Sequence, residues 1–153
     1  MFSFLRPYIF NIDPETAHDL AIKSLKFNFL PESFFSVENE EILKTTLFGK
    51  EISNPVGLAA GFDKNAEVYN EILKLGFGFV EVGTITPKKQ YGNQKPRIFR
   101  LAKDYALINR LGFNNDGSEI IKRRIEDNTP DGLLGINIGP NKETTNITND
   151  FLE

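Results

Sequence analysis

The sequence contains no cysteine, no tryptophan and a single histidine, His18. The absence of cysteine excludes disulfides, thiolate nucleophiles and cysteine-ligated zinc, and one histidine cannot build a histidine-rich metal centre, so we predict no metal site. The 18 lysines and arginines are outnumbered by 21 aspartates and glutamates, for a net charge of −3, which argues against binding to nucleic acid. No run of about 20 apolar residues is present, so we expect no membrane-spanning helix.

Residues 1–38 form a compositional segment distinct from residues 39–153. Asp13 followed by Pro14 is typical of a helix N-cap with proline at the first helical position. The apolar side chains that mark the segment include Phe2, Phe4, Leu5, Tyr8, Ile9, Phe10, Ile12, Ala17, Leu20, Ala21, Leu25, Phe27, Phe29, Leu30, Phe34 and Phe35. A pair of small amphipathic helices with such a face either packs on a protein core or inserts side chains into a membrane surface, and the sequence leaves both open.

The rest of the sequence alternates between strand and helix patterns. We predict a hairpin at 47–52, strands at 55–60, 77–82, 97–101 and 132–138, helices at 66–75 and 116–126, a loop at 140–150 and a helix starting at 151. The predicted buried faces of the two helices are Val68, Ile72, Leu73 and Leu75 in the first, and Ile120, Ile121 and Ile125 in the second. Strand–helix–strand units build parallel sheets, so the predicted fold class is α/β.

The length is short for the barrel that this alternation indicates. A complete (β/α)8 or TIM barrel takes roughly 250 residues, and residues 39–153 amount to about half of one. We therefore expect either a piece of a barrel or a chain that pairs with whatever supplies the remainder. An open half-barrel would also expose a sheet edge, which favours aggregation.

Small or polar residues follow the predicted strands, at the positions where α/β barrels bind ligands. They are Ala60, Gly61, Phe62, Asp63 and Lys64 after the first strand, Thr84 after the second, Asn109, Asn114 and Asn115 in NRLGFNNDG, and Asn137 in GINIG. Small residues let a flat ring approach the backbone, lysine supplies a positive charge, and amides suit a pyrimidine-like ligand. Taken one at a time, a loop lysine, a turn threonine, a helix histidine such as His18 and an arginine such as Arg100 are more often structural.

Together, the motifs resemble those of quinone-linked dihydroorotate dehydrogenase in order and spacing. They are DPETAH (13–18), NPVGLAAGFDKN (54–65), LGFGFVEVGTITP (75–87), GNQKPRIFRL (92–101), ALINRLGFNNDG (106–117) and GINIGPNK (135–142). The resemblance covers nearly the whole chain. The N-terminal segment favours the membrane-associated, quinone-linked class over the soluble class, which lacks such an extension.

This resemblance implies an FMN-containing α/β barrel preceded by a small helical pair, with a role for each matching residue. FMN contacts are implied for Ala60, Gly61, Phe62, Asp63, Lys64, Thr84 and Asn137, substrate contacts for Lys64, Asn109, Arg110, Leu111, Gly112 and Phe113, and a quinone tunnel for His18, Ile98 and Arg100. The implied reaction is oxidation of dihydroorotate to orotate in pyrimidine biosynthesis. A base removes a proton from the substrate, a hydride passes to FMN, and a membrane quinone takes the electrons.

The resemblance also sets expectations for location and completeness. It implies peripheral contact with the cytoplasmic side of an inner membrane, and the lack of an arginine- and serine-rich transit peptide favours a bacterium. The family's catalytic base is a serine on a later strand, beyond Glu153, and Ser118 is a poor substitute, so we assign no catalytic base and expect the chain alone to lack turnover. Two alternatives stay open: a non-catalytic half-barrel that associates with itself or a complementary chain, and a soluble-class flavin barrel enzyme.

Overall fold

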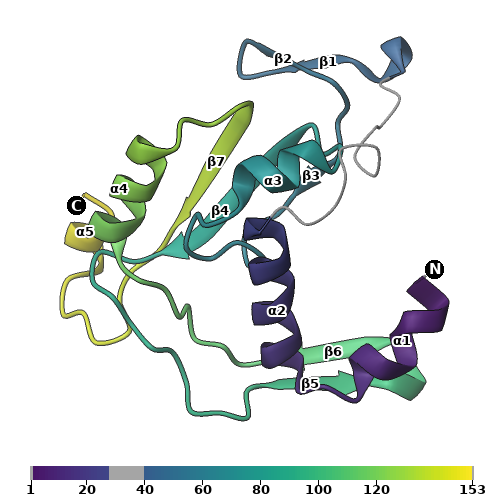
Figure 1. Cartoon of the computed structure of the whole chain (residues 1–153). Helices are drawn as coiled ribbons and strands as arrows, with labels where there is room; N and C mark the ends of the chain where they lie inside the picture. Colours follow the sequence, from purple (N-terminus) through teal and green to yellow (C-terminus); the bar gives the residue numbers. More distant parts are fainter. Residues whose placement is uncertain (1, 28–39, 153) are drawn as a thin grey trace.

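The computed structural model describes residues 2–27 and 40–152, and side chains from residue 6 onward within them. The apolar residues Phe29, Leu30, Phe34 and Phe35 of the N-terminal segment, and the boundary between the segments 1–38 and 39–153, lie outside the described residues. Within them, a small parallel sheet, two antiparallel hairpins and several helices make up the molecule (Figure 1).

Three parallel strands form the centre of the fold. They are β3 (Gly57–Leu58), β4 (Phe79–Ile85) and β7 (Leu133–Ile138), in the order β3-β4-β7. Leu58 pairs with Val80, which pairs in turn with Leu134 on the other side. The crossovers contain the helices α3 (Tyr69–Lys74) and α4 (Ser118–Asp127), so the predicted strand–helix–strand rhythm and parallel pairing are confirmed.

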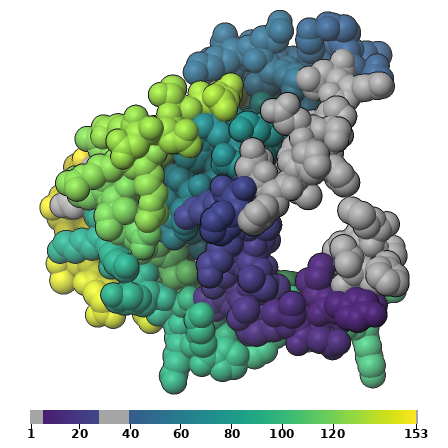
Figure 2. Space-filling model, in the orientation of Figure 1, coloured from purple at the N-terminus to yellow at the C-terminus, as the bar shows by residue number. Residues whose placement is uncertain are grey.

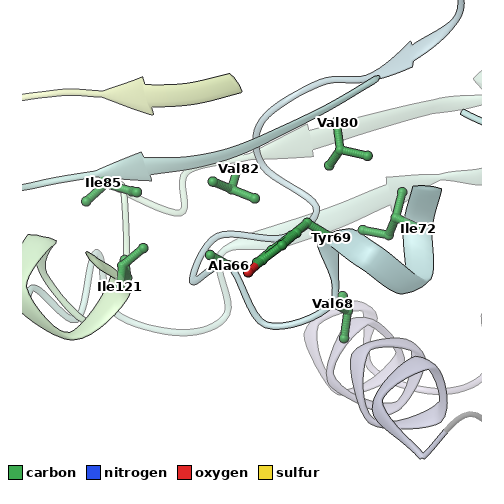
Figure 3. Packing of buried hydrophobic residues seen from close by; sticks show 8 residues of the cluster. All are labelled: Ala66, Val68, Tyr69, Ile72, Val80, Val82, Ile85 and Ile121. Atoms are coloured by element: carbon green, nitrogen blue, oxygen red, sulfur yellow. The ribbon is translucent and has the colours of Figure 1, made fainter. Parts of the chain in front are cut away.

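Helices α3 and α4 bury one face of this sheet (Figure 3). Val80 and Val82 of β4 are fully buried, and they form one cluster with Ile72 of α3 and Ile121 of α4. Burying each such side chain contributes about 1.5–3 kcal/mol. Because side chains alternate along a strand, Glu81, between the two valines, faces away from the cluster.

Two predicted core positions are wrong. Leu75 is 39% exposed because it lies beyond the last residue of α3, next to Gly76 with φ of +100°. Ile120 is 44% exposed, whereas Ile121 is buried. Consecutive helical residues point about 100° apart, so only Ile121 and Ile125, four residues apart, share a face.

Helix α3 begins later than predicted because of a buried carboxylate. Asp63 accepts hydrogen bonds from the backbone N–H groups of Glu67 and Val68, both at 2.8 Å. These bonds fix residues 66–68 in a turn, and the helix starts only at Tyr69.

Strand β4 is longer than predicted and runs through Thr84 to Ile85. Its pairing with β7 shifts register between Val82 and Ile85. Gly83 lies in this irregularity with φ of +114°, and a Cβ there would meet the carbonyl oxygen of Asn137 at 2.4 Å. Only glycine therefore fits between the two strands at this point.

The two hairpins lie on either side of the sheet. The predicted hairpin is confirmed as β1 (Thr45–Leu47) and β2 (Lys50–Ile52), after the short 3-10 helix Glu41–Leu43. Its turn residues Phe48 and Gly49 both have positive φ, as the twist of a two-residue hairpin turn requires. The second hairpin pairs β5 (Ile98–Leu101) with β6 (Ala106–Asn109) across the 3-10 helix Ala102–Asp104; the sequence predicted only its first strand.

The N-terminal helices lie against the second hairpin and α3. Helix α1 (Phe2–Phe10) is followed by α2 (Pro14–Lys26), and the side chain of Asp13 caps α2 as predicted, accepting from Thr16 N–H at 2.9 Å. Helix α2 contacts both α3 and β5, and Figure 2 shows it packed against the middle of the molecule, above the hairpin. No helix within the described residues is long and apolar enough to cross a membrane.

The C-terminal tail contains one more short helix. Helix α5 (Ile147–Asp150) is capped by the side chain of Asn146, which accepts from Asn149 N–H. The predictions of a loop over 140–150 and of a helix start at 151 are both wrong. A four-residue helix is too short to show an apolar period in the sequence.

Candidate functional site

A cleft of about 610 Å³ opens where the strands β3 and β4 end, between the sheet, α2 and the hairpin β5–β6. A volume of this size is typical of sites for small molecules and cofactors. Its lining residues are Pro14, His18, Ala60, Gly61, Lys64, Gly83, Thr84, Asn93, Ile98, Arg100, Leu107, Asn109, Arg110, Leu111, Gly112, Phe113 and Asn114. Of the fifteen residues to which the family resemblance gives a role, twelve are among them; Phe62, Asp63 and Asn137 are not.

The floor of the cleft consists of small residues at the strand ends. Gly61 N–H donates to the carbonyl oxygen of Gly83 at 2.9 Å, which joins the ends of β3 and β4. A Cβ on Gly61 would meet no atom within 4 Å, so the space above it is open. Next to it, the hydroxyl of Thr84 donates to the side-chain oxygen of Asn137 at 2.7 Å. The floor can therefore take a flat group against its backbone.

One wall is a single face of the hairpin β5–β6. Cross-strand pairing places Ile98 beside Asn109 and Arg100 beside Leu107, and all four side chains line the cleft. Arg100 donates to the carbonyl oxygens of Phe10 and Ile12, at 3.2 and 2.7 Å. The hairpin wall is thereby joined to the residues that connect α1 and α2.

The segment from Asn109 to Phe113 forms the rim. The side-chain oxygen of Asn109 accepts a hydrogen bond from Leu111 N–H at 3.5 Å. This bond uses only the oxygen, so the side-chain NH2 group of Asn109 can donate to a ligand. Arg110 also lines the cleft, and its guanidinium lies over the ring of Phe99 at 5.8 Å. Gly112 has φ of +75°, and a Cβ there would lie 3.0 Å from Asn93.

Lys64 and His18 meet at the side of the cleft nearest α2. The Nζ of Lys64 donates to the carbonyl oxygen of Gly61 at 2.7 Å and lies 3.5 Å from Nε2 of His18. The ring of His18 stands edge-on to Phe62, with centroids 5.1 Å apart. Burial lowers the pKa of Lys64, and burial together with the charge of Lys64 lowers the pKa of His18 below 6.5. Both effects on the pKa of His18 favour its neutral imidazole.

The three predicted residues outside the lining have other neighbours. Asp63 is 1% exposed and holds the backbone before α3; burial raises its pKa against the effect of its backbone hydrogen bonds. Phe62 packs against His18. Asn137 links two side chains, accepting from Thr84 and donating to Glu81 at 3.2 Å. Its contact with a ligand stays a prediction.

Two adjacent asparagines, both suggested as ligand groups by sequence, differ in structure. Asn115 is 4% exposed, and its amide makes four hydrogen bonds, to Thr86, Phe113 and Gly117. It is therefore a structural residue. Asn114 lines the cleft, and its buried side-chain oxygen has no hydrogen-bond partner among the described residues.

Sequence reasoning missed several lining residues. Pro14 and Asn93 reach the cleft from segments distant in sequence, and nothing local in the sequence indicates it. The sequence does contain an indication for Gly83, because a glycine directly before a strand-end threonine is typical of a place where another part of the backbone comes close.

The cleft carries positive charge. Lys64, Arg100 and Arg110 line it, and none of the described aspartates or glutamates does. Such a site favours anionic ligands. The described residues also contain no group of three or more side chains able to hold a metal ion.

Comparison with known proteins gives a consistent result. A family model described as "Dihydroorotate dehydrogenase" matches residues 42–153. Proteins named "Dihydroorotate dehydrogenase (quinone)" are similar to this chain. The protein from Rhizobium rhizogenes is 49% identical over 144 residues, which are 94% of this chain and 39% of that protein. The protein from Bartonella henselae is 50% identical over 147 residues, which are 96% of this chain and 40% of that protein. The chain thus spans about two fifths of the length of these relatives.

A solved structure agrees with the sequence comparison. The crystal structure of DHODH from Eimeria tenella in complex with ferulenol matches with a TM-score of 0.83 and 47% identity, over 91% of this chain and 39% of that one. A ligand-free structure of the same protein matches with a TM-score of 0.81.

Proposed function

This chain belongs to the dihydroorotate dehydrogenase family, and from that membership we propose that it forms part of a quinone-dependent enzyme that oxidises dihydroorotate to orotate in pyrimidine biosynthesis. The cleft is the proposed site. The observation that carries the proposal is the meeting of two strand ends, a cationic lining and the amide of Asn109 in one cavity. The relatives carry "quinone" in their names, which favours the quinone class over the soluble class.

FMN fits the floor of this cleft. Ala60, Gly61 and Gly83 project no long side chain, and Gly61 faces open space. Lys64 and Thr84 supply a cation and a hydroxyl beside that floor. We propose that these residues hold the flavin, with Asn137 fixing Thr84 from below. When bound, the flavin accepts the two electrons that leave the substrate and later passes them on.

The substrate is an anion with amide groups in a ring, and the rim suits both features. Dihydroorotate would place its carboxylate toward Lys64 and its ring amide toward Asn109. The backbone of Leu111, Gly112 and Phe113 would close over it. Ile98, Arg100 and His18 would line the approach of the quinone from the side of α1 and α2. These residues bind and orient; the catalytic base is expected outside this chain.

Architecture and location follow from the same proposal. The sheet β3-β4-β7 would be the first part of a TIM barrel over residues 39–153, and residues 1–38 would form an accessory helical unit that gives quinone its access. Peripheral attachment to the cytoplasmic side of a bacterial inner membrane would bring the cleft to the quinone pool. Apolar side chains exposed on α1, such as Tyr8 at 65%, support such a contact.

The test uses the protein as its gene encodes it. The flavin absorbance of the purified protein is recorded, and dihydroorotate is then added without oxygen. The proposal predicts bleaching of a bound flavin and its recovery when a short-chain ubiquinone is added. A folded protein without flavin, or a flavin that dihydroorotate does not bleach, would contradict it.

A further inference from the structure

The hairpin β5–β6 is exposed on both of its faces. Residues 101–110 are all exposed, and they include the whole of β6, whose first three residues are apolar. A surface hairpin normally buries apolar side chains on one face and presents polar ones on the other. Here Leu107 and Ile108, which point to opposite faces, are 57% and 55% exposed. An exposed apolar element of this kind is typical of an interaction surface.

Helix α1 lies beside the turn of this hairpin (Figure 1). The guanidinium of Arg6 lies 4.9 Å from the ring centre of Phe10 on its own helix and 5.6 Å from that of Tyr105 in the turn. Arg100 of β5 lies 4.9 Å from the same ring of Phe10 and donates to the carbonyl oxygens of Phe10 and Ile12. These contacts hold α1 and the turn together, so their side chains form one surface.

The side chains on this surface are aromatic, aliphatic or basic. Tyr105 is 86% exposed, because the turn projects it from the end of the hairpin with φ of +50°. Aromatic rings beside lysine or arginine are the composition found where proteins contact the interface of a bilayer. The members of this tip surface are Arg6, Tyr8 and Phe10 of α1, and Leu101, Lys103 and Tyr105 of the hairpin.

The charge around the tip surface is opposite in sign to that of the chain. Residues 1–12 and 98–110 contain four arginines and lysines and one acidic residue, Asp104, whereas the whole chain has a net charge of −3. None of the ion pairs formed by the described residues includes Arg6, Arg100 or Lys103. Cations without acidic partners complement the phosphates of anionic lipids.

We propose that the tip surface docks onto an anionic bilayer, so that the turn of the hairpin β5–β6 enters the membrane interface together with α1. The inference rests on the proposed function and adds to it a second contact, made by an element of the barrel segment. Tyr105 and Leu101 would lie at the boundary between headgroups and acyl chains. Arg6 and Lys103 would lie at the lipid phosphates.

The position of the hairpin explains why this contact would serve the reaction. Arg100 and Leu107, which pair with each other next to the turn, both line the cleft. The hairpin therefore reaches from the tip surface to the wall of the cleft. An apolar quinone that leaves the bilayer at the turn would follow this wall and avoid passage through water.

Vesicle binding tests the role of charge. The protein as its gene encodes it is sedimented with vesicles of phosphatidylcholine alone, or of phosphatidylcholine and phosphatidylglycerol in equal parts. Wild type should bind the anionic vesicles more tightly, and Lys103→Gln should weaken that binding about fivefold. The control Lys122→Gln removes the same charge from α4, where the side chain is 70% exposed, and should bind as wild type. Equal effects of the two substitutions, or no preference for anionic vesicles, would contradict the proposal.

Fluorescence quenching tests whether the turn enters the bilayer. Tyr105→Trp is compared with Tyr91→Trp, because both tyrosines are exposed and each has a cation near its ring. Tyr91 lies in the loop before β5, at the other end of the hairpin. Lipids brominated in their acyl chains should quench the emission added by Tyr105→Trp and leave that added by Tyr91→Trp unchanged.

Absence of this quenching in Tyr105→Trp would overturn the proposal. Aqueous iodide then identifies what replaces it. If iodide quenches the emission added by Tyr105→Trp, the turn faces water and docks on nothing. If iodide does not, another protein surface, either the remainder of the protein or a second copy, covers the turn.

A quinone assay separates this proposal from the proposed function. In Tyr105→Asn, which retains a residue type that tolerates positive φ, reoxidation of the flavin by a soluble short-chain ubiquinone should be unchanged. Reoxidation by a long-chain ubiquinone held in anionic vesicles should fall about tenfold, because the ring no longer enters the bilayer. Equal rates for wild type and Tyr105→Asn with the vesicle-bound quinone would contradict the tip surface and leave the proposed function standing. A wild-type flavin that dihydroorotate does not bleach would refute the proposed function, whereas vesicle binding and quenching would still report on the tip surface.

Discussion

The guanidinium of Arg97 binds both carboxylate oxygens of Glu15, with Nε 3.0 Å from one and Nη2 2.5 Å from the other. The side chains are 6% and 14% exposed. The remaining nitrogen of Arg97 donates to the backbone oxygens of Tyr91 and Asn93. Helix α2, which carries His18, is thereby fixed to the loop before β5. This bidentate pair therefore joins two of the elements that border the cleft, α2 and the hairpin β5–β6.

Removal of this carboxylate should destabilise the protein strongly. Glu15→Ala leaves Arg97 buried without its anion, a change that typically costs about 3–5 kcal/mol. Urea unfolding of the protein as its gene encodes it measures the loss. Glu126→Ala, whose side chain is 61% exposed, is the control and should change the free energy of unfolding by less than about 0.5 kcal/mol. Equal effects of the two changes would contradict the role of the pair.

The same pair predicts a pH dependence. Hydrogen bonds from Arg97 hold the pKa of Glu15 below its ordinary value of 4.5 in the folded state. A carboxyl group of this kind stabilises the fold above its unfolded pKa, and the contribution is lost as pH falls through the folded pKa. Stability should therefore decline below about pH 4.5 less steeply in Glu15→Gln than in wild type.

Urea unfolding across this acid range checks that prediction. Asp63 acts with the opposite sign, because burial raises its pKa, but it is present in both proteins and cancels in the comparison. If the free energy of unfolding of wild type and of Glu15→Gln depends on pH in the same way, protonation of Glu15 is not coupled to unfolding, and the prediction is wrong.

The neighbouring asparagines should separate stability from ligand binding. Asn115→Ala breaks four hydrogen bonds in a buried site and should cost at least about 2 kcal/mol. Asn114→Ala, which removes an oxygen without a described partner, should cost less than about 1 kcal/mol. Thermal or urea unfolding distinguishes them, and a larger loss in Asn114→Ala than in Asn115→Ala would reverse our assignment.

Adjacent isoleucines of α4 give a further internal control. Ile121 is 1% exposed within the core cluster, and Ile121→Ala should destabilise by about 2–5 kcal/mol through the cavity that it leaves. Ile120 is 44% exposed, and Ile120→Ala should cost less than about 1 kcal/mol. Equal losses in urea unfolding would mean that α4 is rotated on the sheet.

The sequence predicted those parts of the fold that depend on the spacing of nearby apolar residues and on local turn and cap motifs. The strand–helix–strand rhythm, the β1–β2 turn and the cap at Asp13 were all readable from neighbouring residues. The exposure of Leu75 and Ile120 was not, because the end of a helix and its rotation on the sheet depend on tertiary packing. The extension of β4 through Gly83 likewise depends on how close the backbone of β7 approaches.

The candidate site was predictable where its residues follow strands. Gly61, Lys64 and Thr84 meet in one cleft because the carboxyl ends of the parallel strands β3 and β4 share an edge, and Asn109 joins them from the end of the antiparallel strand β6. The contacts between distant segments were not predictable: Glu15 binds Arg97 across 82 positions, and Lys64 meets His18 across 46. Nor does residue type distinguish the structural Asn115 from Asn114 beside it.

The central claim, that this cleft binds dihydroorotate against a flavin, is tested most directly by titration. Dihydroorotate or orotate is added to the flavin-loaded protein, and the flavin spectrum gives the affinity for wild type, Asn109→Ala and the exposed control Asn149→Ala. Loss of the amide that faces the ligand should weaken binding at least about tenfold in Asn109→Ala and leave Asn149→Ala as wild type. Unchanged affinity in Asn109→Ala would contradict the claim and place the substrate elsewhere.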